Sequence, residues 1–345
     1  MAVHAYTSFS LSYYNRARVW AESTRRAHPE WVLWAVLTDR APEGFDPAAL
    51  TDVFDRVLMS DDLLGDTAEA WLFCHDVIEA CTAVKGAALE HILDQPEVEK
   101  VFYFDPDTAI FNRHDPMVDA LDHASILLTP HQVTPDTNRI AIIDNEITSL
   151  HYGTFNLGFL AVRNDAETRR FARWWTERLT DWCHDRLDIG VFVDQKWCNL
   201  VPCFFDDVKI WRDPGYNVAS WNLSQRTLAF DDTGELTVNG QPLRFFHFTK
   251  LGPIGDVMTQ RYAAGNTEVY EIWSWYRMQV EAATRTDIPP GWWYYGVFEN
   301  GTRIPKAARE LYRNRADLRT AFPNPRNCDG KNYCAWLLEN TELLA

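Results

Sequence analysis

The sequence predicts an α/β protein with a mainly parallel central sheet and flanking helices. Short apolar runs alternate with helical segments of ten or more residues through the N-terminal third, a pattern typical of parallel sheets with crossover helices. The clearest run, residues 31–37, is apolar throughout and predicts a strand buried on both faces. Ligands of such sheets bind beyond the carboxyl ends of the strands, so we expect a site there.

The elements of the N-terminal part follow from two periodicities. Short apolar runs predict strands, and apolar residues recurring every three to four positions predict helices. The expected strands are residues 2–7, 31–37, 53–59 (a weaker pattern) and 100–104. The expected helices are residues 11–28, which end at His28-Pro29, and about 67–93, which end before Pro96.

The rest of the chain is expected to hold shorter strands and a helical C-terminal part. The expected strands are residues 125–129, 158–162, 208–211 and 243–248, with a hairpin at 231–234 and 239–240. The expected helices are 167–182, 273–283 and 306–322, and residues 132–145 are expected to form a long loop. We expect residues 1–268 to form the main domain and 269–345 a mostly helical extension packed on it.

The amino-acid composition limits the kinds of molecule that this protein is expected to bind. The 345 residues include 33 Lys and Arg against 49 Asp and Glu, a net charge of −16. An acidic surface argues against a nucleic-acid partner, which favours basic patches. An acidic enzyme that handles an anionic substrate must therefore supply local cations, most simply a divalent metal. Aromatic residues are 14% of the chain, including 15 Trp, which suits stacking on sugars or bases or simply a large core.

The seven cysteines and the first residues indicate a cytoplasmic protein. The cysteines are scattered and form no CxxC pair, so we expect reduced core thiols and no structural zinc. No signal peptide is visible at the start, and no apolar run approaches the ~20 residues that cross a bilayer.

Asp105-Pro106-Asp107 is the most informative motif. It follows the apolar strand 100–104, and two carboxylates at the end of a buried strand can share one Mg²⁺ or Mn²⁺ ion. Such an ion would bridge an acidic protein and a diphosphate. The alternative is a solvated turn, since Asp and Pro both favour turns.

A second motif lies near residue 247. His247 sits in an otherwise apolar strand and is a candidate third ligand; the alternative is a hydrogen-bonded core histidine. Lys250, three residues later, could contact a phosphate as a point charge, or be a solvated strand end.

Four motifs in order resemble the sugar-nucleotide glycosyltransferases of the GT-A fold, and most closely the retaining family 8 enzymes and their bacterial relatives. They are Asp105-Pro-Asp107, Gly153-Thr-Phe-Asn156-Leu-Gly158, Val193-Asp194-Gln195-Lys196-Trp197 and Phe246-His247-Phe248. The resemblance covers roughly residues 1–255 and implies the GT-A fold with a C-terminal extension.

The resemblance also implies roles for individual residues. Asp105, Asp107 and His247 would bind Mn²⁺ or Mg²⁺ and, through it, the donor diphosphate. Asp194 and Gln195 would lie beneath the anomeric carbon. The remaining implied substrate contacts are Thr7, Ser8 and Asp39 at the nucleoside, Asn156 and Gly158 at the donor sugar, and Lys85 and Lys250. The stretch after the first strand, Thr7-Ser8-Phe9-Ser10, lacks a clear uridine signature.

The expected activity is metal-dependent transfer of a hexose from a nucleotide-diphosphate sugar, with UDP as the expected nucleotide, to a carbohydrate or other hydroxyl acceptor. Because an amide is a poor nucleophile, we expect Gln195 to support front-face attack with retention of configuration, while Asp194 holds sugar hydroxyls or caps a helix. Asp144 and Glu146 are weaker candidates for contacts to sugar or acceptor.

Two alternatives stay open: a sugar-nucleotide hydrolase, and a non-catalytic carbohydrate- or nucleotide-binding protein on the same fold. A nicotinamide dehydrogenase is disfavoured because no glycine follows the first strand, where GxGxxG would stand. The aromatic run at 292–295 is expected to line an acceptor cleft, to form a dimer contact or to pack on the main domain. Homo-oligomerisation is left open.

Overall fold

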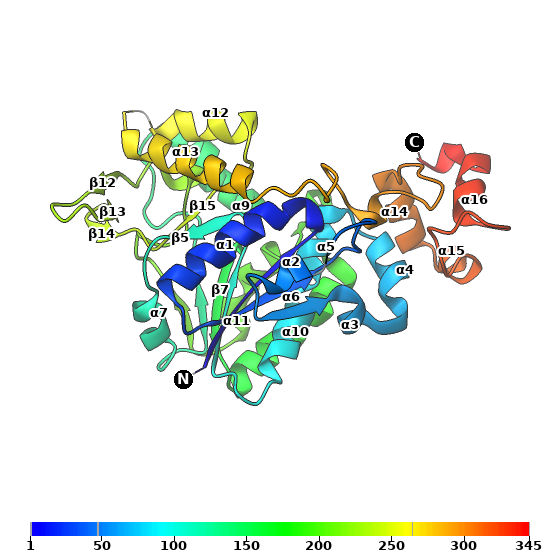
Figure 1. Cartoon of the computed structure of the whole chain (residues 1–345), viewed down its shortest axis with the longest axis horizontal. Helices are drawn as coiled ribbons and strands as arrows, with labels where there is room; N and C mark the ends of the chain where they lie inside the picture. Colours follow the sequence, from blue (N-terminus) through cyan, green and yellow to red (C-terminus); the bar gives the residue numbers. More distant parts are fainter. Residues whose placement is uncertain (1, 47, 264, 345) are drawn as a thin grey trace.

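The computed structural model describes residues 2–46, 48–263 and 265–344. Its centre is a seven-stranded sheet in which β7 runs antiparallel to both neighbours and the other four pairings are parallel (Figure 1). This confirms the predicted α/β class with a mainly parallel sheet. In spatial order the strands are β10 (Val208–Ile210), β6 (Ile126–Leu128), β7 (Phe159–Arg163), β4 (Lys100–Phe104), β1 (Val3–Phe9), β2 (Val32–Leu37) and β3 (Arg56–Met59).

The sheet is covered on both faces. Successive side chains of a strand point to opposite faces, so Ala5 packs in one core with α1 (Tyr14–Ala27) while Tyr6 packs in another. The second core includes α6 (Lys85–Leu93) and α10 (Ala166–Trp182). The continuous apolar runs of the sequence are explained by burial on both sides.

Smaller sheets and the remaining helices surround this centre. The other strands are β5 (Thr108–Ile110), β8 (Asp185–Arg186), β9 (Val191–Phe192), β11 (Val218–Ala219), β12 (Leu228–Phe230), β13 (Leu236–Val238), β14 (Gln241–Pro242) and β15 (Phe245–His247). The other helices are α2 (Ala48–Thr51), α3 (Ser60–Leu64), α4 (Ala68–Phe73), α5 (Val77–Ala83), α7 (Asp115–Ala120), α8 (Arg139–Ala141), α9 (Thr148–Tyr152), α11 (Val201–Phe204), α12 (Pro253–Ala263), α13 (Thr267–Ala282), α14 (Lys306–Asn314), α15 (Ala316–Ala321) and α16 (Tyr333–Glu339).

Two helical predictions were too long. The expected helix over 67–93 is divided into α4, α5 and α6, because Asp76 begins a new helix by accepting the N–H groups of Ile78 and Glu79. Glu79 returns the bond to the N–H of Asp76, which completes a capping box. The expected helix over 306–322 is likewise divided into α14 and α15, with Arg315 between them.

The predicted loop over 132–145 is wrong in its second half. Asn138 caps α8 by accepting the N–H of Ile140, and a π-helical segment (Ile142–Ile147) leads into α9. The predicted hairpin is confirmed: β12, β13 and β14 form an antiparallel sheet. Asn239 and Gly240 have φ values of 50° and 78°, as a tight turn between β13 and β14 requires.

The C-terminal helices lie at the end of the molecule opposite the β12–β14 hairpin (Figure 1). Phe73 of α4 packs among side chains of α14, α15 and α16, which ties this region to the body. The division at residue 268 stays a prediction, and α13 spans it. Among the described residues, none of the helices has both the length and the apolar character needed to cross a membrane. All seven cysteines are free, and Cys203 is exposed.

The aromatic run at 292–295 packs on the body, as one of its three expected arrangements. Trp292 Nε1 donates to the carbonyl oxygen of Arg40 at 2.9 Å, and the N–H of Tyr294 donates to Asp39 Oδ1 at 2.7 Å. Tyr295 is fully buried. The run therefore covers the carboxyl end of β2.

The close approach of α6 and α10 gives a testable prediction. A Cβ atom on Gly86 would lie 2.8 Å from Thr176 Cα. We expect Gly86→Ala to lower the free energy of unfolding by about 1–3 kcal/mol, because neither backbone can move without disturbing the core. Urea unfolding measures the change. Gly265→Ala, where an added Cβ meets nothing within 4 Å, is the control and is expected to stay within about 0.5 kcal/mol of the parent. Equal effects of the two changes would contradict this account.

Candidate functional site

The pairing of two short strands brings the predicted metal ligands together. Asp105 and Asp107 lie between β4 and β5, and β15 pairs antiparallel with β5 so that His247 is opposite Thr108. His247 Nε2 lies 3.0 Å from Asp107 Oδ1 and 3.8 Å from Asp105 Oδ2. The three candidate ligand atoms all lie within 4.8 Å of one another.

The cluster has the donors that a divalent cation needs. Burial raises the pKa of Asp107, but the nearby His247 outweighs it and holds that pKa below its ordinary value. For His247, burial lowers the pKa, and the two carboxylates overcome this and raise it. The acidic pair therefore attracts positive charge into a buried site, which a cation with carboxylate and imidazole ligands would supply.

Gly158 makes room for the imidazole. A Cβ atom at this position would lie 2.4 Å from His247 Cε1 and 2.7 Å from His247 Nδ1. Only glycine lets the backbone approach the ring so closely. Gly158, which is expected at the donor sugar, leaves the space that the His247 ring occupies.

A buried lysine connects the cluster to Asp194. Lys85 Nζ lies 3.0 Å from Asp105 Oδ1 and 2.9 Å from Asp194 Oδ2, and it also donates to the carbonyl oxygen of Leu157 at 3.0 Å. The side chains of Lys85 and Asp194 are only 2% and 3% exposed. Burial, with a smaller contribution from Asp105, raises the pKa of Asp194 to about 6, although Lys85 acts in the opposite direction. Tyr103 donates a further hydrogen bond to Asp105 Oδ1 at 2.6 Å.

The amides of Gln195 and Asn156 are fixed by hydrogen bonds to each other and to the backbone. Gln195 Oε1 accepts from Asn156 Nδ2 at 3.3 Å and from the N–H of Leu157 at 3.2 Å. Gln195 Nε2 donates to the carbonyl oxygen of Tyr152 at 3.3 Å. Asn156 Oδ1 accepts from the N–H of Gly158, one residue before β7. Asp194, Gln195, Asn156 and the Asp105–Asp107–His247 cluster are thus one connected group.

The three residues expected at the nucleoside have separate contacts, unlike the connected residues of the group above. Ser8 Oγ donates to the carbonyl oxygen of Cys81 at 2.6 Å, and Thr7 is buried in β1. The carboxylate of Asp39 accepts three backbone N–H groups, those of Leu11, Arg40 and Tyr294. Burial raises the pKa of Asp39 to about 7 against these three donors. Its carboxylate is therefore occupied in holding three segments together.

Lys250 lies just beyond β15 and is exposed. Its φ of 56° places the backbone in the left-handed region, so the chain turns sharply after the strand that carries His247. Among the described contacts, its side chain makes no hydrogen bond or ion pair within the chain.

Three neighbours of the site had no role in the sequence analysis. His131 Nε2 accepts from Asn156 Nδ2 at 3.2 Å, and burial lowers the pKa of His131 to about 4, which keeps it neutral. Asn217 Nδ2 donates to Asn156 Oδ1 at 3.0 Å. The ring of Trp221 lies edge-on to His247, with centroids 5.1 Å apart. His131 had no sequence signal; it directly precedes the polar stretch 132–145 that was expected to be a loop.

No family model matches the chain. Over 215 residues it is 26% identical to the uncharacterized protein YfnF of Bacillus subtilis (strain 168). That match covers 62% of this chain and 64% of the relative, which is less than two thirds of the relative's length.

The chain is also similar to solved structures of glycosyltransferases, the class that the sequence motifs resemble. For galactosyltransferase LgtC the identity is 16%, with 79% of this chain and 95% of that chain covered and a TM-score of 0.46. For mouse xyloside xylosyltransferase 1 the identity is 13%, the coverage 73% and 99%, and the TM-score 0.41. For the glycosyltransferase GlyE of Streptococcus pneumoniae TIGR4 the identity is 14%, with 81% of this chain and 64% of that chain covered and a TM-score of 0.43.

The Lys85–Asp194 pair gives a prediction about stability. Lys85→Met leaves the Asp194 carboxylate buried without its cation, and we expect the free energy of unfolding to fall by about 3–5 kcal/mol. Asp194→Asn in the same chain removes that stranded charge. The double variant is therefore expected to be more stable than the sum of the single changes implies, by at least about 1 kcal/mol. Urea unfolding of all four proteins measures this coupling, and additive effects would contradict the direct pairing.

Proposed function

We propose that this chain transfers a sugar from a nucleotide-diphosphate sugar to a hydroxyl acceptor, with the help of a divalent cation. The observation that carries the proposal is the Asp105–Asp107–His247 cluster at the end of the central sheet. Two carboxylates and an imidazole are ligands suited to Mn²⁺ or Mg²⁺. In a chain of net charge −16, such a cation allows a diphosphate to bind beside acidic side chains.

The cation would be held by Asp105, Asp107 and His247, and when bound it would offset the negative charge that develops on the departing diphosphate. Lys85 pairs with Asp105 and so helps to hold its carboxylate in place. Lys250, exposed beyond β15, is proposed to contact a phosphate. The nucleoside end of the site is proposed to be formed by Thr7, Ser8 and Asp39, and UDP is the favoured nucleotide. The end that binds the donor hexose is proposed to be formed by Asn156 and Gly158.

We further propose that transfer retains the anomeric configuration. Asp194 is buried and paired with Lys85, which favours a role in holding charge over direct attack on the sugar. Gln195 has a neutral amide fixed by Asn156 and by Tyr152, and an amide is a weak nucleophile. These two features support attack by the acceptor on the face from which the diphosphate leaves, with Gln195 as a polar support.

Asp107→Ala tests the metal assignment. We expect release of nucleotide diphosphate from UDP-sugars in the presence of Mn²⁺ to fall by at least about a hundredfold, because a charge-stabilising group is lost. A thermal-shift screen of UDP-sugars with and without Mn²⁺ should show stabilisation of the parent but not of this variant. Asp232→Ala, an exposed carboxylate of the β12–β13 hairpin, is the control. Unchanged Mn²⁺-dependent nucleotide binding in Asp107→Ala would sink the metal assignment.

Proton NMR of the transferred sugar tests the stereochemistry. With an α-linked UDP-hexose donor, the first product formed is expected to carry an α linkage, since retention preserves the configuration at the anomeric carbon. The coupling constant of the anomeric proton, followed from the start of the reaction, distinguishes the two outcomes. A β-linked first product would refute retention while leaving the metal site untouched.

A further inference from the structure

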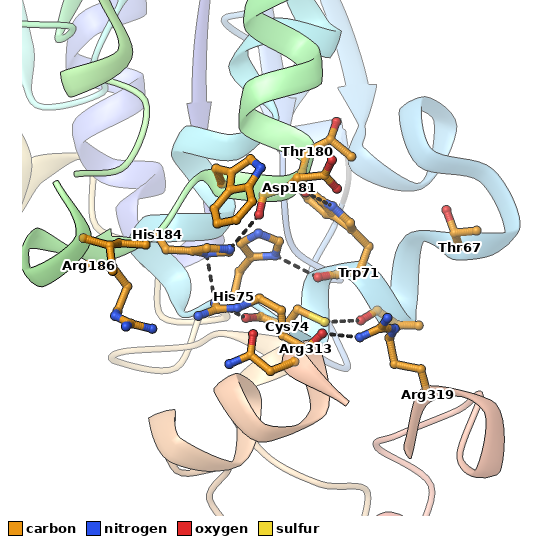
Figure 2. Close-up of a pocket in the computed structure, with 14 residues that line it drawn as sticks. Thr67, Trp71, Cys74, His75, Thr180, Asp181, His184, Arg186, Arg313 and Arg319 are labelled. Carbon is orange, nitrogen blue, oxygen red and sulfur yellow. Dashed lines mark hydrogen bonds between the residues drawn. The ribbon is translucent and has the colours of Figure 1, made fainter. Parts of the chain in front are cut away.

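A separate cavity lies where α4 and the end of α10 meet α14 and α15 (Figure 2). Its volume is about 480 Å³, a size suited to a ligand of one or two sugar rings. Asp105, Asp107 and His247 do not line it. Residues of both the body and the C-terminal helices form its wall.

Three arginines bring positive charge to this cavity. Arg186 pairs with Asp188 through Nε and Nη2, while Arg313 Nη1 donates to the carbonyl oxygen of Cys74 and to His184 Nδ1. Arg319 Nη1 donates to the backbone carbonyl oxygens of Tyr312 and Arg313, both in α14. Each of these contacts uses only part of a guanidinium's five N–H donors, so donors remain for a ligand. Acidic groups nearby are Asp181 in the wall and Glu79, whose Oε2 is 4.0 Å from Arg313.

His75, one of the residues that line the cavity, has a buried ring nitrogen without a hydrogen-bond partner among the described residues. His75 Nδ1 donates to the carbonyl oxygen of Trp71 at 2.8 Å, so Nε2 carries the lone pair. His75 is 1% exposed, and Nε2 has no hydrogen-bond partner among the described residues. His184 differs, because Nε2 donates to the carbonyl oxygen of Asp181 and Nδ1 accepts from Arg313. Burial lowers the pKa of His75 to about 3, which keeps it a neutral acceptor.

Aromatic surface completes the wall. The rings of Trp71 and His75 lie together with centroids 4.2 Å apart, and His75 lies between Trp71 and His184 (Figure 2). Trp182, at the end of α10, is 50% exposed. An exposed indole beside polar groups is the usual surface on which the C–H face of a sugar packs.

We propose that this cavity binds a sugar that carries an acid group. The acid group faces Arg313 and Arg319, and the sugar ring packs against Trp182. An inorganic anion would satisfy the arginines but leave the indole unused. The acid group is a carboxylate, as in a uronic acid, or a phosphate; both present oxygen acceptors to guanidinium groups. This site goes beyond the proposed transfer reaction and gives the C-terminal helices a role.

Isothermal titration of the intact protein tests the proposal, in EDTA and without any nucleotide. The probes are glucuronic acid, glucose 6-phosphate, glucose and inorganic phosphate. At least one acidic sugar is expected to bind at least about tenfold tighter than either glucose or phosphate. The two acidic probes distinguish a carboxylate from a phosphate ligand.

Trp182→Ala and Arg319→Gln change exposed side chains, and each is expected to weaken that binding at least about tenfold. Arg178→Gln, on α10 but outside the cavity wall, removes the same charge and is expected to leave binding unchanged. The proposal is overturned if neither acidic sugar binds, if glucose or phosphate binds equally well, or if both cavity variants bind like the parent. Since no metal or donor is present, this result is independent of the outcome for sugar transfer.

Discussion

One buried ammonium group organises the centre of this protein. Lys85 Nζ stands between Asp105 and Asp194 at 3.0 and 2.9 Å, almost wholly removed from water. Burying charges is costly unless they are closely paired and hydrogen-bonded, and here a carbonyl oxygen and the hydroxyl of Tyr103 complete the set. The neighbouring elements position these groups: β4 ends one residue before Asp105, α6 begins at Lys85, and Gly86 lets α6 approach α10 closely.

Positive charge is placed close to negative groups elsewhere in the molecule as well. Acidic residues outnumber basic ones by 49 to 33, and several positive groups lie beside carboxylates or where anions are expected to bind. Lys85 pairs with Asp105 of the cluster and with Asp194, a divalent cation is proposed for the cluster itself, and arginines line the cavity at the C-terminal helices. Asp39 shows the reverse case, a buried carboxylate held by backbone N–H groups alone.

The features that the sequence did not predict depend on a short-range interaction or on a distant segment of the chain. The apolar period over 67–93 is continuous, but the capping box at Asp76 and Glu79 divides the helix there. Asp39 ends a strand at the expected edge of the sheet, yet a segment more than 250 residues later donates to its carboxylate. His131 has no local pattern at all, and only the approach of Asn156 places it at the site.

The sequence by itself determined the class of fold and the chemistry of the cluster. Alternating apolar runs require a sheet buried on both faces, and Asp105, Asp107 and His247 lie at strand ends whichever way the strands are ordered. Only the tertiary structure decided which groups meet. The β5–β15 pairing sets His247 against Asp107, and the packing of α6 seats Lys85 over Asp194. Periodicity records which face of an element is buried, whereas contacts between charges depend on how distant elements pack.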